Sequence, residues 1–241
     1  MNYSDYIKRF NDYYKDYDDS VWHINMKYKH TFRVVSYAKR IAMSLNLSEA
    51  DVDLACSCAL FHDIARFSQW KNYQTYEDSK SFDHGDEGYR ILKEIGIDDE
   101  IILKSTLYHN KFKIDEKLDD RTLMFCNITR DADKIDIMFE QVNEMKDEIY
   151  YMSDDLVSCF RNHEQLKNGM MPEDIYLFRI LRCLAFIFDI NFVESFKIIK
   201  DKKIIDFKCN KILEKFDEDV IKEIRDICNN YVDERIDSNV R

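Results

Sequence analysis

Histidine and aspartate residues recur through the first half of the chain. Four of its six histidines stand at similar intervals: His30, His62, His84 and His109. Asp63 directly follows the second of them, and the acidic stretch RDADKID (130–136) comes one interval after the last. Neutral imidazole nitrogens suit iron, zinc or manganese, while carboxylates add charge compensation and can bridge two ions. The residue types therefore predict a metal site.

This set is large enough for two ions, because one metal needs only three or four protein ligands. Two ions roughly 3.5–4 Å apart can clamp the attacking and leaving oxygens of a phosphoryl transfer and lower the pKa of a bound water. The last ligand stays open at this point. Periodicity over 123–142 places Asp131 on the apolar face of its helix, while Asp133 falls on the other side.

The elements that position these residues should all be helices. Four glycines and one proline in 241 residues are too few for tight hairpins and glycine-rich phosphate loops. Hydrophobic residues make up 45% of the chain, as in a globular protein. Imidazoles and carboxylates at the inner ends of several helices are how helical bundles build metal sites.

Two predicted helices carry the first ligands. His30 lies four residues before Val34, on the apolar face of a helix from about Trp22 to Leu45. Ser48 caps a third helix, whose inner stripe ends at the His62–Asp63 pair. Both histidines should therefore point into the core, where an unpartnered imidazole is costly.

The next stretch, 68–83, lacks a clear period and is predicted to be a long loop that covers the substrate. Its aromatic residues, Trp70, Tyr73 and Tyr76, either stack on a base or anchor the loop to the domain. His84 opens the following helix, which Gly96 ends. A further helix begins after Asp98–Asp99 and runs to His109, before the helix with the RDADKID stretch.

The remainder of the chain lacks such motifs. We expect helices within 152–169, over 175–188 and 192–199, and a last helix with an apolar face from Cys209 to Tyr231. The predicted organisation is an N-terminal helix (1–19) packed on a metal-binding domain (20–145), with a C-terminal helical extension (146–241) of the same globular unit.

Charge and cysteine content restrict the partners and the compartment. A net charge of -11 disfavours nucleic acid and anionic membranes as partners, but permits a small anion in a locally positive pocket. The seven cysteines include no CxxC pair, so they are expected to be free thiols in a reducing cytoplasm. The N-terminal residues lack an apolar signal core, and no apolar run reaches membrane-spanning length.

The ordered set of motifs resembles the HD-domain metal-dependent phosphohydrolase superfamily, whose pattern is H…HD…H…H…D on an all-α scaffold. The matching stretches are KHTFRVVSYA around His30, ALFHDIARF around His62 and Asp63, DHGDEGYRIL around His84, LYHNKF around His109 and DADKID around Asp133. The resemblance covers roughly half of the chain and implies an HD-like helical bundle.

The resemblance also implies roles for these residues. The core metal set would be His30, His62, Asp63 and Asp133, with His84 and His109 added in the dinuclear branch. Asp63 would bridge two divalent ions (Fe, Mn, Zn, Ni, Co or Mg). The resemblance favours Asp133 over Asp131, which is kept in reserve.

Arg66 stands where the family often has a basic residue, and it either contacts a substrate phosphate or pairs with a loop carboxylate. Asn110 and Lys134 are further candidates for substrate contact, although both positions commonly have no role beyond loop entry or the surface. Asn110 replaces the paired histidine of the cyclic-di-GMP-cleaving branch, which disfavours that substrate. Ala65 replaces a frequent glycine.

The expected function is metal-dependent hydrolysis of a small phosphate ester or anhydride, with nucleotides as the leading substrate class and a metal-activated water as nucleophile. Two alternatives remain at the level of sequence. A few HD-domain proteins resemble this one in the same ligand set but hold a di-iron centre and carry out oxygenation. A metal-loaded regulatory module would bind nucleotides without turnover. The sequence leaves the oligomeric state open.

Overall fold

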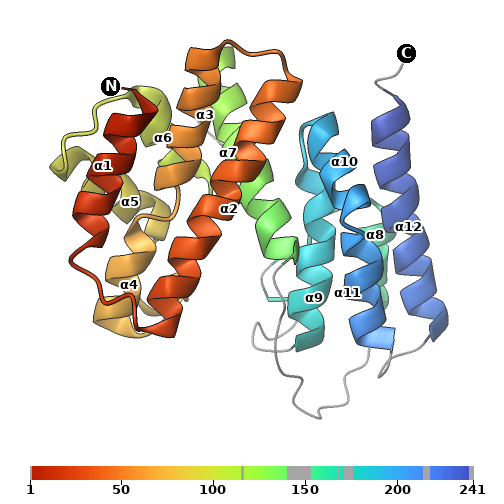
Figure 1. Cartoon of the computed structure of the whole chain (residues 1–241). Helices are drawn as coiled ribbons and strands as arrows, with labels where there is room; N and C mark the ends of the chain where they lie inside the picture. The colour runs from red at the N-terminus through yellow and green to blue at the C-terminus, as the bar shows by residue number, and fades with distance from the viewer. Residues whose placement is uncertain are drawn as a thin grey trace. The chain divides into compact units, whose positions relative to one another are not determined.

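The computed structural model describes residues 2–114, 117–139, 153–167, 169–170, 176–213 and 218–238, and its regular structure there is entirely helical (Figure 1). The predicted all-α class is confirmed. The earlier helices are α1 (Tyr3–Tyr14), α2 (Trp22–Ser44), α3 (Glu49–Phe61), α4 (Ala65–Tyr73), the 3-10 turn η1 (Asp78–Lys80), α5 (His84–Glu94), α6 (Glu100–Tyr108) and α7 (Asp120–Phe139). The later ones are α8 (Asp154–Arg161), α9 (Tyr176–Ala185), the 3-10 turn η2 (Phe186–Asp189), α10 (Val193–Asp201), α11 (Ile204–Leu213) and α12 (Glu218–Asp237).

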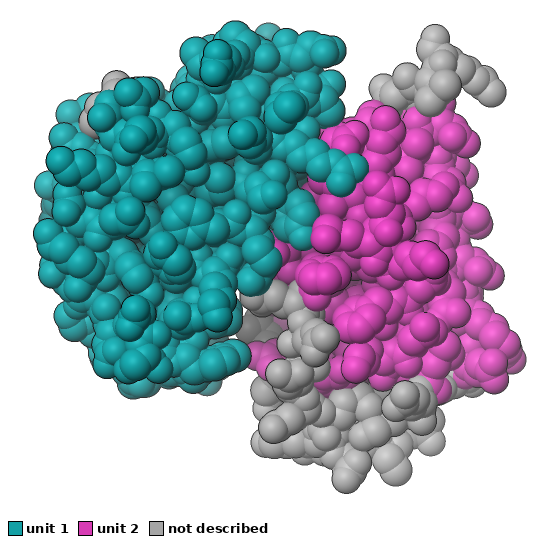
Figure 2. Space-filling model, viewed as in Figure 1, with its two compact units in different colours: residues 1–133 teal, residues 134–241 magenta. Residues whose placement is uncertain are grey.

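The chain forms two compact units, residues 1–133 and 134–241 (Figure 2). The division falls inside α7, between Asp133 and Lys134. The segment 1–19, which the sequence set apart, belongs to the first unit. The boundary expected after residue 145 lies outside the described residues.

An aromatic cluster holds α1 on the first unit. Asn2 caps α1 through a capping box with Asp5, so the helix begins at Tyr3. Its Phe10 is fully buried, with ring centroids 6.0 Å from Phe32 and 6.3 Å from Phe61. These rings pack α1 against α2 and α3, and so cover the core behind the His–Asp pair.

Helix α3 ends directly before the His62–Asp63 pair. The Ser48 side chain accepts a hydrogen bond from the Asp51 amide and starts the helix, as predicted. All seven residues of its second half, 55–61, are buried. His62 is the C-cap, so α3 places His62 and Asp63 at a buried helix end.

The loop predicted from residue 68 onward is partly wrong, because α4 continues to Tyr73 and η1 forms one further turn. The period was hidden by Gln69, a polar side chain that is fully buried on the inner face of α4. Its amide donates hydrogen bonds to Ser81 Oγ (2.7 Å) and Asp78 Oδ1 (3.0 Å). Polar contacts therefore tie the 74–83 segment to α4.

Two glycines bring α5 close to α6. Asp83 caps α5 by accepting from the Gly85 and Asp86 amides. A Cβ built at Gly85 would lie 2.4 Å from Asn110 Oδ1 and 2.7 Å from the Leu107 carbonyl oxygen, and one at Gly88 would lie 2.7 Å from Thr106 Cγ2. The absence of a side chain thus lets His84 approach His109.

In the second unit, α12 packs against α8, α10 and α11, and α9 packs against α11. The single last helix that the sequence predicted corresponds to two helices, α11 and α12; residues 214–217 lie outside the described part. Over the described residues, no helix combines the length and apolarity needed to cross a bilayer.

Replacing Gly85 with alanine tests the close α5–α6 approach. In an exposed helix, alanine stabilises by about 1 kcal/mol relative to glycine. Here the new methyl group would strike a backbone oxygen, so we expect a loss of about 1–3 kcal/mol in the free energy of unfolding. Urea denaturation measures it, and a stabilised variant would contradict this packing.

Candidate metal centre

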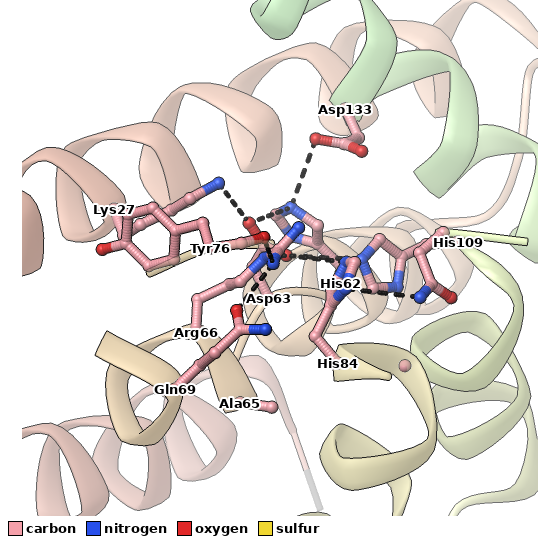
Figure 3. A network of polar contacts seen from close by, with 12 residues as sticks. Lys27, His62, Asp63, Ala65, Arg66, Gln69, Tyr76, His84, His109 and Asp133 are labelled. Carbon is pink, nitrogen blue, oxygen red and sulfur yellow. Dashed lines mark hydrogen bonds and ion pairs between the residues drawn. The ribbon is translucent and has the colours of Figure 1, made fainter. Parts of the chain in front are cut away.

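Six of the predicted ligands lie together in the first unit as two groups of three (Figure 3). One group consists of His30, His62 and Asp133, and the other of Asp63, His84 and His109. Within each group the ligand atoms lie within 4.8 Å of one another. They come from α2, the α3–α4 junction, the start of α5, the end of α6 and α7.

Asp133 belongs to the first group. Its Oδ1 lies 3.1 Å from His30 Nε2 and 3.5 Å from His62 Nε2. Burial alone would raise the pKa of Asp133, but hydrogen bonds with these two histidines hold it well below its usual range. Between the two aspartates that the sequence left open, the structure brings Asp133 to the histidines. Asp131 is fully buried in the same helix.

The carboxylate of Asp63 lies between the two groups. Its Oδ2 is 3.5 Å from His30 Nε2 and 3.7 Å from His62 Nε2. Its Oδ1 is 3.3 Å from His109 Nε2 and 3.6 Å from His84 Nε2. Each oxygen thus faces one group, which is the placement that a bridging carboxylate requires.

Three of the imidazoles are oriented through their outer nitrogens. Nδ1 lies 2.7 Å from the Ala59 carbonyl in His62 and 2.7 Å from the Thr106 carbonyl in His109. In His84 it lies 2.6 Å from Asp78 Oδ2. An Nδ1–H that donates to such an acceptor leaves Nε2 of the neutral ring as a lone pair, as metal ligands require.

The inner nitrogens fit a metal ion. His30 Nε2 and His62 Nε2 are 3.2 Å apart. Two nitrogens bound to one ion at about 2.0–2.1 Å stand about 2.8–3.4 Å apart at octahedral or tetrahedral angles. A donor set of imidazole and carboxylate suits zinc, iron, manganese and similar divalent ions. The residues present therefore match the predicted kind of site.

Two cations flank the central carboxylate. Lys27 Nζ lies 2.8 Å from Asp63 Oδ2, and Arg66 Nε lies 3.4 Å from Asp63 Oδ1. Burial alone would raise the pKa of Asp63, but Lys27, with His62 and a hydrogen bond with His109, holds it well below its usual range. The carboxylate therefore stays ionised despite its 4% exposure.

Arg66 is fixed on one side and open on the other. Its Nη1 donates to Gln69 Oε1 (2.6 Å), the Tyr76 carbonyl (2.7 Å) and Asp78 Oδ1 (3.0 Å). Its Nε is buried without a hydrogen-bond partner and faces Asp63. A buried N–H donor without a hydrogen-bond acceptor, beside the two groups of ligands, is suited to an added anion.

Asn110 and Lys134, the other predicted substrate contacts, have partners within the protein. The amide of Asn110 donates to Asp83 Oδ1 (2.9 Å), and Lys134 pairs with Asp189 in the second unit. Asn110 Nδ2 also lies 3.3 Å from His84 Nδ1, whereas the Lys134–Asp189 pair involves none of the six ligands.

The aromatic residues of the 68–83 stretch anchor it. The Trp70 ring stacks 3.5 Å from His23, and the Tyr76 hydroxyl donates to the His23 carbonyl at 2.9 Å. Tyr73 is half-exposed and packs on Phe82. Of the two roles that the sequence left open, these contacts match anchoring.

Lys27, Gln69 and Asp78 were missed by the sequence reasoning. The sequence pattern could have identified Lys27, because it precedes His30 by one helical turn and so lies on the same face of the helix. Gln69 could have been identified in the same way, since it lies one turn after Arg66. Nothing in the pattern marked Asp78, whose contact with His84 depends on the path of the 74–83 segment.

The buried guanidinium of Arg130 supports the end of α6. It donates to the carbonyl oxygens of Tyr108 (2.9 Å) and Lys111 (2.6 Å). These two residues enclose His109, so α7 holds the chain on both sides of this ligand. The motif RDADKID thus contributes a brace as well as Asp133.

Residues 28–138 match the family model described as the HD domain. Comparisons with curated proteins and with solved structures gave no match. The matched stretch contains all six ligands together with Arg66.

The pH dependence of stability tests the buried state of His84. Burial, and then the charge of Arg66, lowers the pKa of His84 from 6.5 to about 4. Between these values His84 is protonated in the unfolded chain and neutral in the folded chain. The free energy of unfolding of chelator-treated protein should therefore fall by roughly 3 kcal/mol as the pH drops through this window.

The variant His84→Asn lacks this titration, so its stability should decrease less over the same pH range. Chemical denaturation at a series of pH values measures both proteins. Parallel curves for the two would contradict a buried, neutral His84.

Proposed function

We propose that the protein is a phosphohydrolase acting on a small phosphate ester or anhydride, because residues 28–138 match the HD-domain family model, which suggests metal-dependent hydrolase-type activity. The observation that carries the proposal is the position of the Asp63 carboxylate. Each of its two oxygens faces one group of ligands, and a cation lies beside each oxygen. Such a centre combines metal sites with positive charge for an anionic substrate.

Two divalent ions are proposed, one for each group of ligands, with Asp63 shared between them. The first would be held by His30, His62 and Asp133, and the second by His84 and His109. Bound there, the ions would supply Lewis acidity and lower the pKa of a water that acts as nucleophile. The protein's own part is to fix the ligands and to place charge around the reacting phosphate.

Arg66 is proposed to bind a non-bridging phosphate oxygen through its inward-facing side. Its Nε lacks a hydrogen-bond partner, and its Nη1 contacts keep the guanidinium from turning away. Lys27 would act with it. When the charge of Asp63 is taken up by metal ions, the Lys27 ammonium can turn to a substrate anion, since it sits on a flexible stem.

A nucleotide is the proposed substrate class. The support comes from the groups that would bind its phosphate, not from groups that would bind its base. The Trp70 ring stacks on His23, and the Tyr76 ring lies against the cations of Lys27 and Arg66 while its hydroxyl bonds the His23 carbonyl, so stacking on a base is not part of the support. The Asn110 amide donates a hydrogen bond to Asp83. Asn110 also stands where the cyclic-di-GMP-cleaving branch has a second histidine, so that substrate is disfavoured. Mononucleotides and simple phosphomonoesters are therefore the first compounds to test.

Elemental analysis together with a phosphate-release panel tests the proposal. Purified protein reloaded with manganese should hold about two ions per chain and release phosphate from some nucleotides or phosphomonoesters. The Asp63→Asn variant should lose ions from both groups and nearly all activity. Two bound irons with oxygen consumption and no phosphate release would instead point to oxygenation.

Substituting Arg66 tests its role in binding. Arg66→Ala should lower kcat/KM for the best substrate by roughly 10- to 100-fold, the range expected for a lost charge-assisted hydrogen bond. Metal content should stay at the wild-type value. The matched control is Arg90→Ala, which removes an exposed arginine of α5 that pairs with Glu87 and Glu94. Equal losses in the two variants would argue against phosphate binding by Arg66.

A further inference from the structure

Asp78, in the 3-10 turn of the 74–83 segment, contacts a metal ligand and the proposed phosphate-binding arginine at once. Its Oδ2 lies 2.6 Å from His84 Nδ1, and its Oδ1 accepts from Arg66 Nη1 at 3.0 Å. We propose that Asp78 is a positioning residue that tunes the second group of ligands and orients Arg66. The inference rests on the proposed function, since it concerns the same site.

The partner of His84 differs from those of its neighbours. His62 and His109 direct Nδ1 to the neutral carbonyl oxygens of Ala59 and Thr106, whereas His84 directs it to a carboxylate. A charged acceptor fixes the tautomer and raises the basicity of the metal-binding nitrogen. Asp78 therefore strengthens one ligand of the second group and none of the first.

The other oxygen of Asp78 determines how Arg66 points. Together with Gln69 Oε1 and the Tyr76 carbonyl, it accepts hydrogen bonds from Nη1 and so holds that end of the guanidinium. This arrangement leaves Nε beside Asp63 Oδ1. Figure 3 shows Arg66 between Gln69 and Asp63, with Tyr76 close by. The orientation of the arginine thus depends on the same carboxylate as His84.

Asp78 is itself held by the protein. Gln69 Nε2 donates to Oδ1 at 3.0 Å, and Asn110 Nδ2 lies 3.4 Å from Oδ2. Gln69 also holds Ser81, so the segment cannot shift without breaking this network. The 74–83 segment is accordingly part of the support of the site. Through Asp78 it orients His84, a ligand of the second group, by its outer nitrogen.

The variant Asp78→Asn gives the test. His84 and Arg66 contact different oxygens of Asp78, and an amide puts a donor NH2 group in place of one of them, so it cannot accept at both positions. If its nitrogen faces His84, the ring must present a lone pair at Nδ1 and carry its proton on Nε2, which blocks metal binding. We expect the affinity of the second manganese ion to fall roughly 10- to 100-fold while the first ion binds as in wild type.

The matched control is Asp83→Asn, the same change five residues on. Asp83 caps α5 and bonds Asn110, and asparagine also caps helices well. This variant should keep both ions. Asp78→Asn should also raise KM more than it lowers kcat, through Arg66. Retention of both ions by Asp78→Asn, or loss of both by the two variants alike, would overturn the proposal.

A measurement on the wild-type protein tests the proposal even if the Asp78→Asn variant does not fold. In metal-free protein at neutral pH, nitrogen-15 NMR of the histidine rings should show His84 with its proton on Nδ1. A proton on Nε2 would overturn the proposal. Wild-type protein that binds two ions but releases no phosphate would defeat the proposed function and leave the role of Asp78 in metal binding standing.

Discussion

The site depends on one buried negative charge. Isolated in a protein interior, an ionised carboxylate costs several kcal/mol, and it persists only with compensating partners. Asp63 has Lys27 and Arg66 on opposite oxygens and four imidazoles around it. Lys27 and His30 come from α2, and the other partners come from the α3–α4 junction, α4, the start of α5 and the end of α6, so compensation of a single charge brings these elements together.

The site also requires that α5 and α6 approach each other closely. The ring of His84 reaches Asp63 because α5 lies against α6 at two glycines, and the polar contacts of Gln69 fix the segment before it. Arg130 holds the carbonyl groups on either side of His109. These polar groups near the centre thus serve to position the ligands.

The sequence predicted the helices and the ligands where the signal was local. His30 follows from its place on an apolar face, and the His62–Asp63 pair from the end of an apolar stripe. The extent of α4 did not follow, because Gln69 is polar and buried, and periodicity assumes that buried means apolar. Periodicity favoured Asp131, which lies on the apolar face, whereas the structure brings Asp133 to His30 and His62, because this helix is buried on several sides.

Helix α7 has a consequence for the inheritance of this site. Its last residue in the first unit is Asp133, and the next peptide bond leads to Lys134, whose partner Asp189 belongs to the second unit. A gene fragment that stopped at residue 138, where the family match ends, would encode all six ligands but would deprive Lys134 of Asp189. Exchange of the whole C-terminal unit by recombination would carry Lys134 and Asp189 together, whereas a crossover between residues 134 and 189 would separate this pair.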